Sequence, residues 1–183
     1  MPEFVTICPI GPVKERIIEE IAASISSSLG LDCSVSREIK IPESAFSKTR
    51  TQYNSKLILK HLFKGFNPSV FRVLGVTEVD LYVPILKYVF GLAQINGPCS
   101  LISLYRLRPQ IYDQPPDLEI LLERAEKTAL HELGHTLGLI HCRDRSCIMF
   151  SSTKIKDTDS KQRAFCPTCH ALFRWYLEKM KRI

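Results

Sequence analysis

The stretch His131-Glu-Leu-Gly-His135-Thr-Leu-Gly138-Leu-Ile-His141 places three imidazoles and one carboxylate within eleven residues. On a helix, His131 and His135 project from the same face because they are four residues apart, and Glu132 lies about 100° further round. Gly138 tolerates the positive φ that ends a helix, so the following turn can bring His141 back towards the other two histidines. The pattern therefore predicts one metal ion held by three histidines.

Three neutral histidines suit zinc and leave the fourth tetrahedral position open for water, which is typical of catalytic zinc sites. Zinc lowers the pKa of such a water to about 7, and Glu132 can accept its proton as a general base. The HExxH pattern alone also occurs by chance on helices, but Gly138 and His141 in register favour the zinc site. The sequence thus predicts a hydrolytic zinc site with Glu132 as its catalytic residue.

Four cysteines form a second candidate metal site directly after these histidines. Cys142 and Cys147 are one pair and Cys166 and Cys169 are another, with 18 residues between Cys147 and Cys166. Two such pairs are typical of a structural zinc site that four thiolates close to water. Free cysteines, or a redox pair at Cys166 and Cys169, are the alternatives, but a redox pair would not explain Cys142 and Cys147. We expect two zinc ions per chain, one catalytic and one structural.

The other cysteines and histidines fit simpler roles. Cys8, Cys33 and Cys99 lie in strand-like segments and are expected in the core. His61 has no partner motif, so we expect an ordinary surface or core histidine. His170 follows Cys169 and could replace a cysteine ligand, which is the less favoured arrangement.

The net charge of +6 comes entirely from the last 41 residues, which hold 10 Lys or Arg against 4 Asp or Glu. A basic tail can bind nucleic acid or another acidic partner. Four thiolates around one zinc ion also carry net negative charge. Arg143, Arg145, Lys161 and Arg163 flank the cysteines, and we expect them to stabilise that charge. Nucleic acid is therefore not needed as a partner to explain the basic tail.

The chain of 183 residues, 45% of them hydrophobic and 24% charged, has the size and composition of one soluble globular domain. It shows neither a basic segment followed by an apolar run at its start nor about 18 successive apolar residues anywhere. We therefore expect a cytoplasmic protein without a signal peptide or membrane span, and a monomer.

Hydrophobic periodicity and turn residues predict an α/β (α+β) fold in which a helix with the histidines lies against a twisted, mostly parallel sheet, with a backing helix. The expected strands cover 4–8, 32–41, 70–83, 88–95 and 99–107, and the expected helices 13–29, 52–63, 114–139 and 163–181. We expect a single catalytic domain over 1–183. Residues 1–141 would form its upper subdomain, and 142–183 a small lower helical lobe stabilised by the cysteine zinc site.

The motif from His131 to His141, followed by Cys147-x-Met149, resembles the metzincin clan of zinc peptidases. In that clan a methionine lies in a tight turn beneath the metal, and Met149 is the candidate here. The four cysteines resemble the second zinc site of the archaemetzincins, so the similarity to that family covers residues 131–169. The segments 50–53 and 74–84 are also similar to the family but are less diagnostic.

This resemblance implies a zinc metallopeptidase that hydrolyses peptide bonds in a peptide or protein substrate. It also implies a metzincin-like cleft above the metal, with an edge strand that pairs with an extended substrate. By order in the chain, we expect Cys99–Leu107 to be that edge. Two departures stand out: only 16 residues separate Met149 from Cys166, one fewer than the family spacing, and Ser151 stands where some metzincins carry a tyrosine ligand.

Two other functions fit part of the pattern. A zinc hydrolase of non-peptide amides would use the same ligands and the same base. A zinc-stabilised binding module would instead bind nucleic acid through the basic lobe 142–183, with salt-sensitive affinity and no need for Glu132. An open three-histidine site has no use in such a module, and few aromatic residues interleave the basic ones. Nucleic acid is therefore the less favoured partner.

Overall fold

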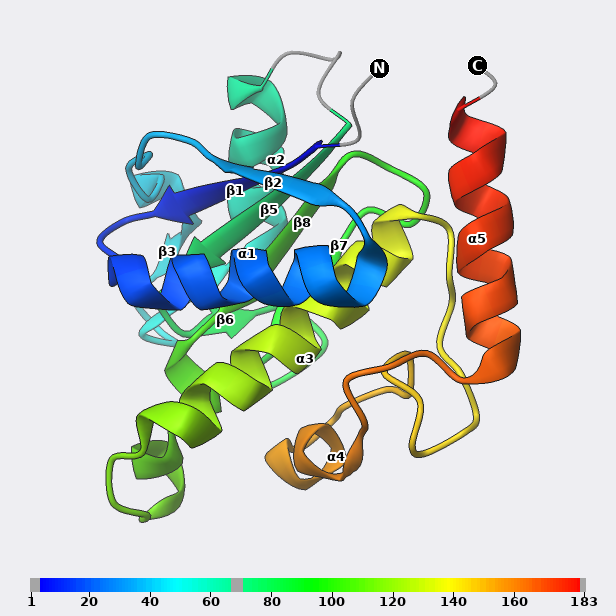
Figure 1. Cartoon of the computed structure of the whole chain (residues 1–183). Helices are drawn as coiled ribbons and strands as arrows, with labels where there is room; N and C mark the ends of the chain where they lie inside the picture. Colours follow the sequence, from blue (N-terminus) through cyan, green and yellow to red (C-terminus); the bar gives the residue numbers. More distant parts are fainter. Residues whose placement is uncertain (1–3, 67–70, 182–183) are drawn as a thin grey trace.

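The computed structural model describes residues 4–66 and 71–181 (Figure 1). The strands of its main sheet are β1 (Phe4–Ile10), β2 (Asp32–Val35), β5 (Arg72–Thr77), β7 (Gly91–Ala93) and β8 (Cys99–Ser103). They lie in the order β2-β1-β5-β8-β7. All neighbouring pairs are parallel except β7 and β8, which run antiparallel. The predicted mostly parallel sheet is therefore confirmed.

The described part of the chain also contains five α-helices: α1 (Glu15–Leu29), α2 (Ser55–Gly65), α3 (Leu118–Thr136), α4 (Ile155–Ser160) and α5 (Pro167–Lys181). α1 and α3 pack against each other on one face of the sheet, and α2 covers the other face (Figure 1). Helices on both faces explain why the central strands are nearly continuous apolar runs rather than alternating ones. The α/β fold class is confirmed.

Alternate side chains of the central strands enter two different cores because successive strand residues point to opposite faces. On β1, Val5 and Ile7 join the core under α1 and α3, whereas Cys8 and Ile10 join the core under α2. Cys99 is also buried in the second core. Burial of these apolar strands fixes the sheet to which the histidine helix α3 is attached.

A smaller three-stranded sheet lies beside the main one, in the order β3-β4-β6. Its strands are β3 (Phe46–Ser47), β4 (Gln52–Asn54) and β6 (Leu81–Tyr82). Three 3-10 turns cover Glu43–Ala45, Tyr105–Leu107 and Pro109–Tyr112. These short elements shape the connections around the candidate site.

The segment after α3 passes beside that helix and ends in α5 (Figure 1). Cys169, Phe173 and Leu177 form the buried side of α5 and join the main core, because they are spaced four residues apart on one face. Leu172 and Trp175 are exposed. The division into subdomains at residue 141 stays a prediction.

Several element boundaries differ from the predictions. The predicted helix over 52–63 begins with a strand, and the predicted strand over 32–41 ends at Val35. The predicted strand over 70–83 is two strands, β5 and β6, and Val70 lies outside the described residues. The short helix α4 was not predicted, since its sequence Ile155-Lys-Asp-Thr-Asp-Ser is too polar and short to show a helical period. No helix in the described part of the chain has both the length and the apolar character needed to cross a bilayer.

Candidate metal centres and active-site cleft

Helix α3 carries His131, Glu132 and His135 in its last two turns. It begins where the Asp117 carboxylate caps the first turn by accepting from the backbone N–H of Ile120, 3.1 Å away. Pro115 and Pro116 precede this cap, so the helix starts later than the prolines suggested. The last two turns lie between the sheet and the C-terminal segment, and all three side chains are less than 9% exposed.

The end of α3 turns His141 back towards the other histidines. Gly138 has a φ of 93°, in the left-handed region that favours glycine, as predicted from the sequence. A side chain there would also meet the ring of Tyr176 at 3.1 Å. The reversal brings the His141 ring centroid to 5.3 Å from that of His131 and 4.9 Å from that of His135.

Hydrogen bonds set which ring nitrogens face one another. The Nδ1–H of His131 donates to the carbonyl of Ile148, and that of His135 to the carbonyl of Leu139, both over 2.8 Å. The two Nε2 atoms then lie only 3.1 Å apart, and one nitrogen of each of the three histidines lies within 4.8 Å of the others. Two nitrogens bound to one tetrahedral zinc are about 3.4 Å apart, so the donor set fits that ion.

Burial also keeps the three imidazoles in the neutral form that metal ligands need. It is the main cause of a lowered pKa at His131, His135 and His141, and the shift is greatest for His131. The nearby Lys161 ammonium lowers the pKa of each ring further. A neutral ring with its Nδ1–H fixed by a carbonyl presents Nε2 as a lone-pair donor.

Glu132 lies against the edge strand β7. A Cβ atom at Gly91 would come within 2.7 Å of both Cγ and Oε1 of Glu132, so the glycine is required for this close approach. Burial raises the pKa of Glu132 to about 8, and the Lys161 ammonium acts in the opposite direction. A carboxyl group with such a pKa can both accept and release a proton near neutral pH.

Met149 packs beneath the histidine pair in a tight turn. Its backbone carbonyl accepts from Cys142 over 2.9 Å, and Phe150 N–H donates to Cys147 over the same distance. A Cβ atom at Gly134 would lie 2.5 Å from the Met149 sulfur. Glycine between the two helical histidines therefore leaves room for the fully buried methionine.

A cleft of about 650 Å³ opens over the histidines and Glu132. Its upper wall comes from β7 and the segment before it, and its lower wall from residues 151–161. Clefts of this volume accommodate small ligands or a few residues of an extended peptide. The histidine cluster therefore faces a space where a substrate can bind.

Residues far apart in the sequence hold the upper wall of this cleft. Arg106 binds both oxygens of Asp80 at 2.6 and 2.7 Å, and Gln52 donates to the same carboxylate over 3.0 Å. The Arg106 guanidinium also lies 4.3 Å above the ring of Tyr88, whose hydroxyl donates to the carbonyl of Thr153 in the lower wall. This network attaches the segments 50–53 and 74–84 to the upper wall of the cleft.

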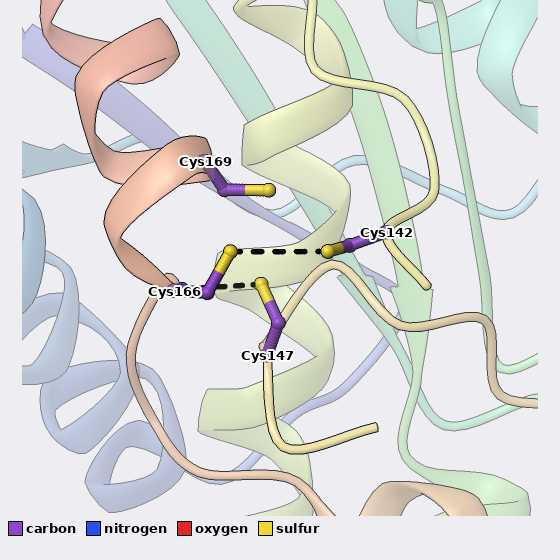
Figure 2. A group of neighbouring side chains, drawn as sticks. All are labelled: Cys142, Cys147, Cys166 and Cys169. Carbon is purple, nitrogen blue, oxygen red and sulfur yellow. Dashed lines mark hydrogen bonds between the residues drawn. The ribbon is translucent and has the colours of Figure 1, made fainter. Parts of the chain in front are cut away.

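The four predicted cysteines meet in one cluster (Figure 2). Their sulfurs all lie within 4.8 Å of one another, and the Sγ atoms of Cys142 and Cys166 are 3.8 Å apart. Sulfurs on one tetrahedral zinc are about 3.8 Å apart, so this donor set also fits zinc. Backbone N–H groups of Asp144 and Cys166 donate to two of the sulfurs, as they would to thiolates.

Two of the four basic residues assigned to this cluster have other partners as well. Arg163 pairs with Glu126 at 2.8 Å, on α3. Lys161 donates to the carbonyl of Ile148 over 3.1 Å and lines the cleft at the histidine site. The negative charge of Cys147 raises the pKa of Lys161, which agrees with the predicted electrostatic interaction between this cation and the cysteine cluster. For Arg163 the role stays a prediction. Arg143 and Arg145 are exposed.

The remaining predicted residues have ordinary surroundings. Cys8 and Cys99 are buried in the core as predicted, and Cys33 is partly buried against it. His61 is exposed, and His170 is exposed and outside the cysteine cluster.

The predicted edge strand is wrong. The strand over 99–107 is β8, which ends at Ser103 and lies inside the sheet between β5 and β7. Asn96-Gly97-Pro98 forms a turn that folds β7 back onto β8, so the strand before the turn becomes the edge. All five residues of β8 are buried, as is typical of an interior strand, but Ser100 and Ser103 interrupt the apolar run that would have indicated this from the sequence.

Sequence reasoning also missed Gly91 and Tyr88 as residues of the site. It named Lys161 but did not predict that this side chain lines the cleft. Each acts through a contact between distant segments, for which the local sequence carries no periodic signal.

Comparison with known proteins places the chain in a family. The model of peptidase family M54 matches residues 12–174. An archaemetzincin of Methanocaldococcus jannaschii is 43% identical over 166 residues, which cover 90% of this chain and 89% of that protein. The crystal structure of the Methanopyrus kandleri archaemetzincin superposes with a TM-score of 0.85 at 35% identity, over 97% of this chain and 96% of that one. A zinc-dependent peptidase of Methanocorpusculum labreanum gives 0.84 at 26% identity, over 92% and 99% of the two chains. The chain therefore belongs to peptidase family M54 with the archaemetzincins, and it is a zinc-dependent metallopeptidase.

Proposed function

We propose that His131, His135 and His141 hold the catalytic zinc of this peptidase. The single observation that carries this assignment is three neutral, converging imidazole nitrogens at the floor of a cleft that also contains Glu132. We propose further that Cys142, Cys147, Cys166 and Cys169 hold a second, structural zinc, so that each chain binds two ions. Their mutual distances and partial burial support this role.

Glu132 is proposed to move the proton during hydrolysis. Zinc in the histidine site would polarise the scissile carbonyl and lower the pKa of a water molecule. Glu132 accepts the proton of the attacking water and passes it to the leaving amine. Its position against Gly91 fixes the carboxylate at the edge strand, and it forms no hydrogen bond with another described side chain that would have to break first.

An extended peptide is proposed to bind along β7. This strand is the antiparallel edge of the sheet and lines the cleft beside Glu132. An edge strand has backbone N–H and C=O groups free to pair with another strand. Pairing there would lay the scissile bond across the histidine cluster.

Replacement of Glu132 by Gln tests this proposal. The amide keeps the shape of the side chain but cannot accept the proton, so hydrolysis should fall at least about a thousandfold while zinc content is unchanged. The measurement is cleavage of a peptide panel by zinc-loaded protein, with metal analysis. Glu119→Gln is the matched control on the same helix, because Glu119 is exposed in the first turn, 3.9 Å from Arg16, and its replacement should leave activity intact. Activity retained by the Glu132 variant would rule out this residue as the base.

Acyl-amide substrates in the same panel address the alternative of a non-peptide amide hydrolase, which would prefer them over all peptides. We also propose that the enzyme is a cytoplasmic monomer, as expected from the sequence. Gel filtration of the zinc-loaded chain tests the monomer, and a dimer at micromolar concentration would contradict it.

A further inference from the structure

The two walls of the cleft differ in chemistry. The upper wall is mostly apolar and includes Tyr88, Val89, Phe90 and Leu92. The lower wall is polar: it is lined by Ser151, Ser152, Thr153, Thr158 and Lys161. A substrate group that packs against the lower wall removes these polar side chains from water. It must therefore offer them hydrogen bonds, because burial of unpaired polar groups is unfavourable.

Lys161 is a buried cation without a paired anion. Its side chain is 5% exposed, and its Nζ atom donates to the carbonyl of Ile148 over 3.1 Å. The Nδ1 atom of His131 lies 3.4 Å away but cannot accept, because it donates its own proton to that carbonyl. Among the described residues, no carboxylate lies within 4.0 Å of this ammonium group.

This arrangement leaves N–H donors of Lys161 unused. An ammonium group carries more donors than one carbonyl can accept, and a buried charge without a counter-charge is strongly destabilising. Lys161 lines the cleft. The free donors are thus available to an anionic group that enters from solvent.

Ser152 gives a second, independent observation on the same wall. Its hydroxyl oxygen is buried and has no hydrogen-bond partner among the described residues. Buried hydroxyl groups without a partner are rare in folded proteins and often mark a place that a ligand or water completes. Ser152 and Lys161 both line the cleft over the histidines.

Burial lowers the pKa of Lys161 to about 8, and the negative charges of Glu132, Cys147 and Asp157 raise it. Among the described residues, none of these groups forms an ion pair with the Lys161 ammonium. Glu132 is the only carboxylate among the residues that line the cleft, and it is the proposed base, held against β7. The missing counter-charge is therefore expected to come with the substrate.

We propose that Lys161 and Ser152 form a carboxylate-binding subsite of the peptidase cleft. The inference rests on the proposed function, since it assumes that His131 marks the catalytic zinc. Lys161 Nζ lies 3.4 Å from the Nδ1 atom of His131, whereas the Nε2 atom of the same ring faces His135. The ammonium group is therefore separated from the proposed zinc position by the width of one imidazole ring. Because successive Cα atoms are only about 3.8 Å apart, the bound carboxylate belongs to a residue next to the scissile bond. It is either an acidic side chain or the C-terminal carboxylate of a short peptide.

Binding rather than turnover tests the subsite. The zinc-loaded Glu132→Gln protein is titrated with four versions of one fluorescent peptide. The peptide is one that the wild type cleaves, or a generic heptapeptide if the wild type cleaves none of the panel. The versions carry Glu or Gln at the central position, and a free or amidated C-terminus. A version with a carboxylate in the subsite should bind at least about tenfold more tightly, as expected for a charged hydrogen bond. Whether the central Glu or the free terminus gives the preference identifies the source of the carboxylate.

Second substitutions in this protein assign the preference to residues. Adding Lys161→Met should remove it, Lys161→Arg should retain most of it, and Ser152→Ala should reduce it severalfold. Zinc content and melting temperature are measured for each variant. If Lys161→Met weakens all four peptides equally, Lys161 only supports the Ile148 carbonyl and the subsite is rejected.

The other outcomes separate the subsite from the proposed function. Equal binding of the four peptides, or no binding of any, overturns the subsite. Cleavage by the wild type without a carboxylate preference leaves the peptidase mechanism intact and rejects the subsite. A preference that depends on Lys161, without cleavage by the wild type, supports the subsite and contradicts the proposed catalytic site.

Discussion

The histidine and cysteine clusters are neighbours in sequence and in space but are built in different ways. Two of the three histidines lie on one buried helix, α3, and the cluster opens onto a cleft of about 650 Å³. The four cysteines come from the loop after α3 and from the start of α5, and two of them are buried (Figure 2). A rigid helix suits ligands that must leave one metal position open, whereas separate segments suit a site whose purpose is to join them.

One short segment couples the two clusters. Cys147 belongs to the cysteine cluster, the carbonyl of Ile148 orients His131, and Met149 packs against Gly134 between the helical histidines. The N–H of Ile148 in turn donates to the carbonyl of Ala164, two residues before Cys166. These contacts support the proposal that the cysteine cluster holds the floor of the histidine cluster, and variants in each cluster test it.

The largest expected effect is on the histidine side. His135→Ala removes one proposed ligand and should lower kcat/KM for peptides by at least about a thousandfold. Zinc content should fall from two ions to one, because the cysteine cluster stays intact. The lost hydrogen bond to the Leu139 carbonyl costs only about 1 kcal/mol of stability, so the fold should persist.

The matched control for this variant is His61→Ala. His61 is exposed on α2 and lies outside both clusters, so zinc content and activity should be unchanged. If His135→Ala keeps two zinc ions, His135 is not a required ligand; if it loses both, the cysteine cluster does not hold its zinc without an intact histidine cluster.

On the cysteine side, Cys169→Ser is expected to affect stability more and catalysis less directly. Free energy of structural zinc binding is also folding free energy, so loss of this ion should lower the melting temperature more than His135→Ala does. The segment 142–166 should become more sensitive to proteolysis, and activity should fall because Ile148 no longer fixes His131. Cys33→Ser is the control, since Cys33 is only partly buried and outside the cluster. Unchanged protection of 142–166 would contradict a structural role for the cysteine site.

The same contrast explains what could be predicted from the sequence. The positions of His131, His135 and Gly138 follow from helix geometry and from the φ that glycine allows, and these are local properties. The cysteine cluster was found because paired spacings are diagnostic even when the pairs are far apart. Local rules therefore sufficed to identify both donor sets.

The walls of the cleft could not be predicted in this way. The Asp80–Arg106 pair and the approach of Gly91 to Glu132 depend on how distant segments meet in the folded chain. The edge strand was misassigned because chain order does not give sheet order when a hairpin follows a parallel strand. The interaction of Lys161 with Cys147 could be expected from sequence proximity, whereas its hydrogen bond to the carbonyl of Ile148 and its place in the cleft could not.

The smallest expected effect concerns the two basic residues that still flank the cysteine cluster. Thiols must lose their protons to bind zinc, and nearby cations favour the thiolate. Replacing Arg143 and Arg145 by Gln should therefore raise the thiol pKa values, so that zinc is released at a higher pH as the solution is acidified. Both side chains are exposed, so the shift should be a few tenths of a pH unit and should shrink with added salt. Zinc release is followed with a colorimetric chelator during acid titration.

Arg163→Gln is the control, because Arg163 pairs with Glu126 on α3 and its replacement should leave the midpoint of zinc release unchanged. An equal shift in the control would mean that net charge alone, rather than proximity to the cysteines, sets zinc retention.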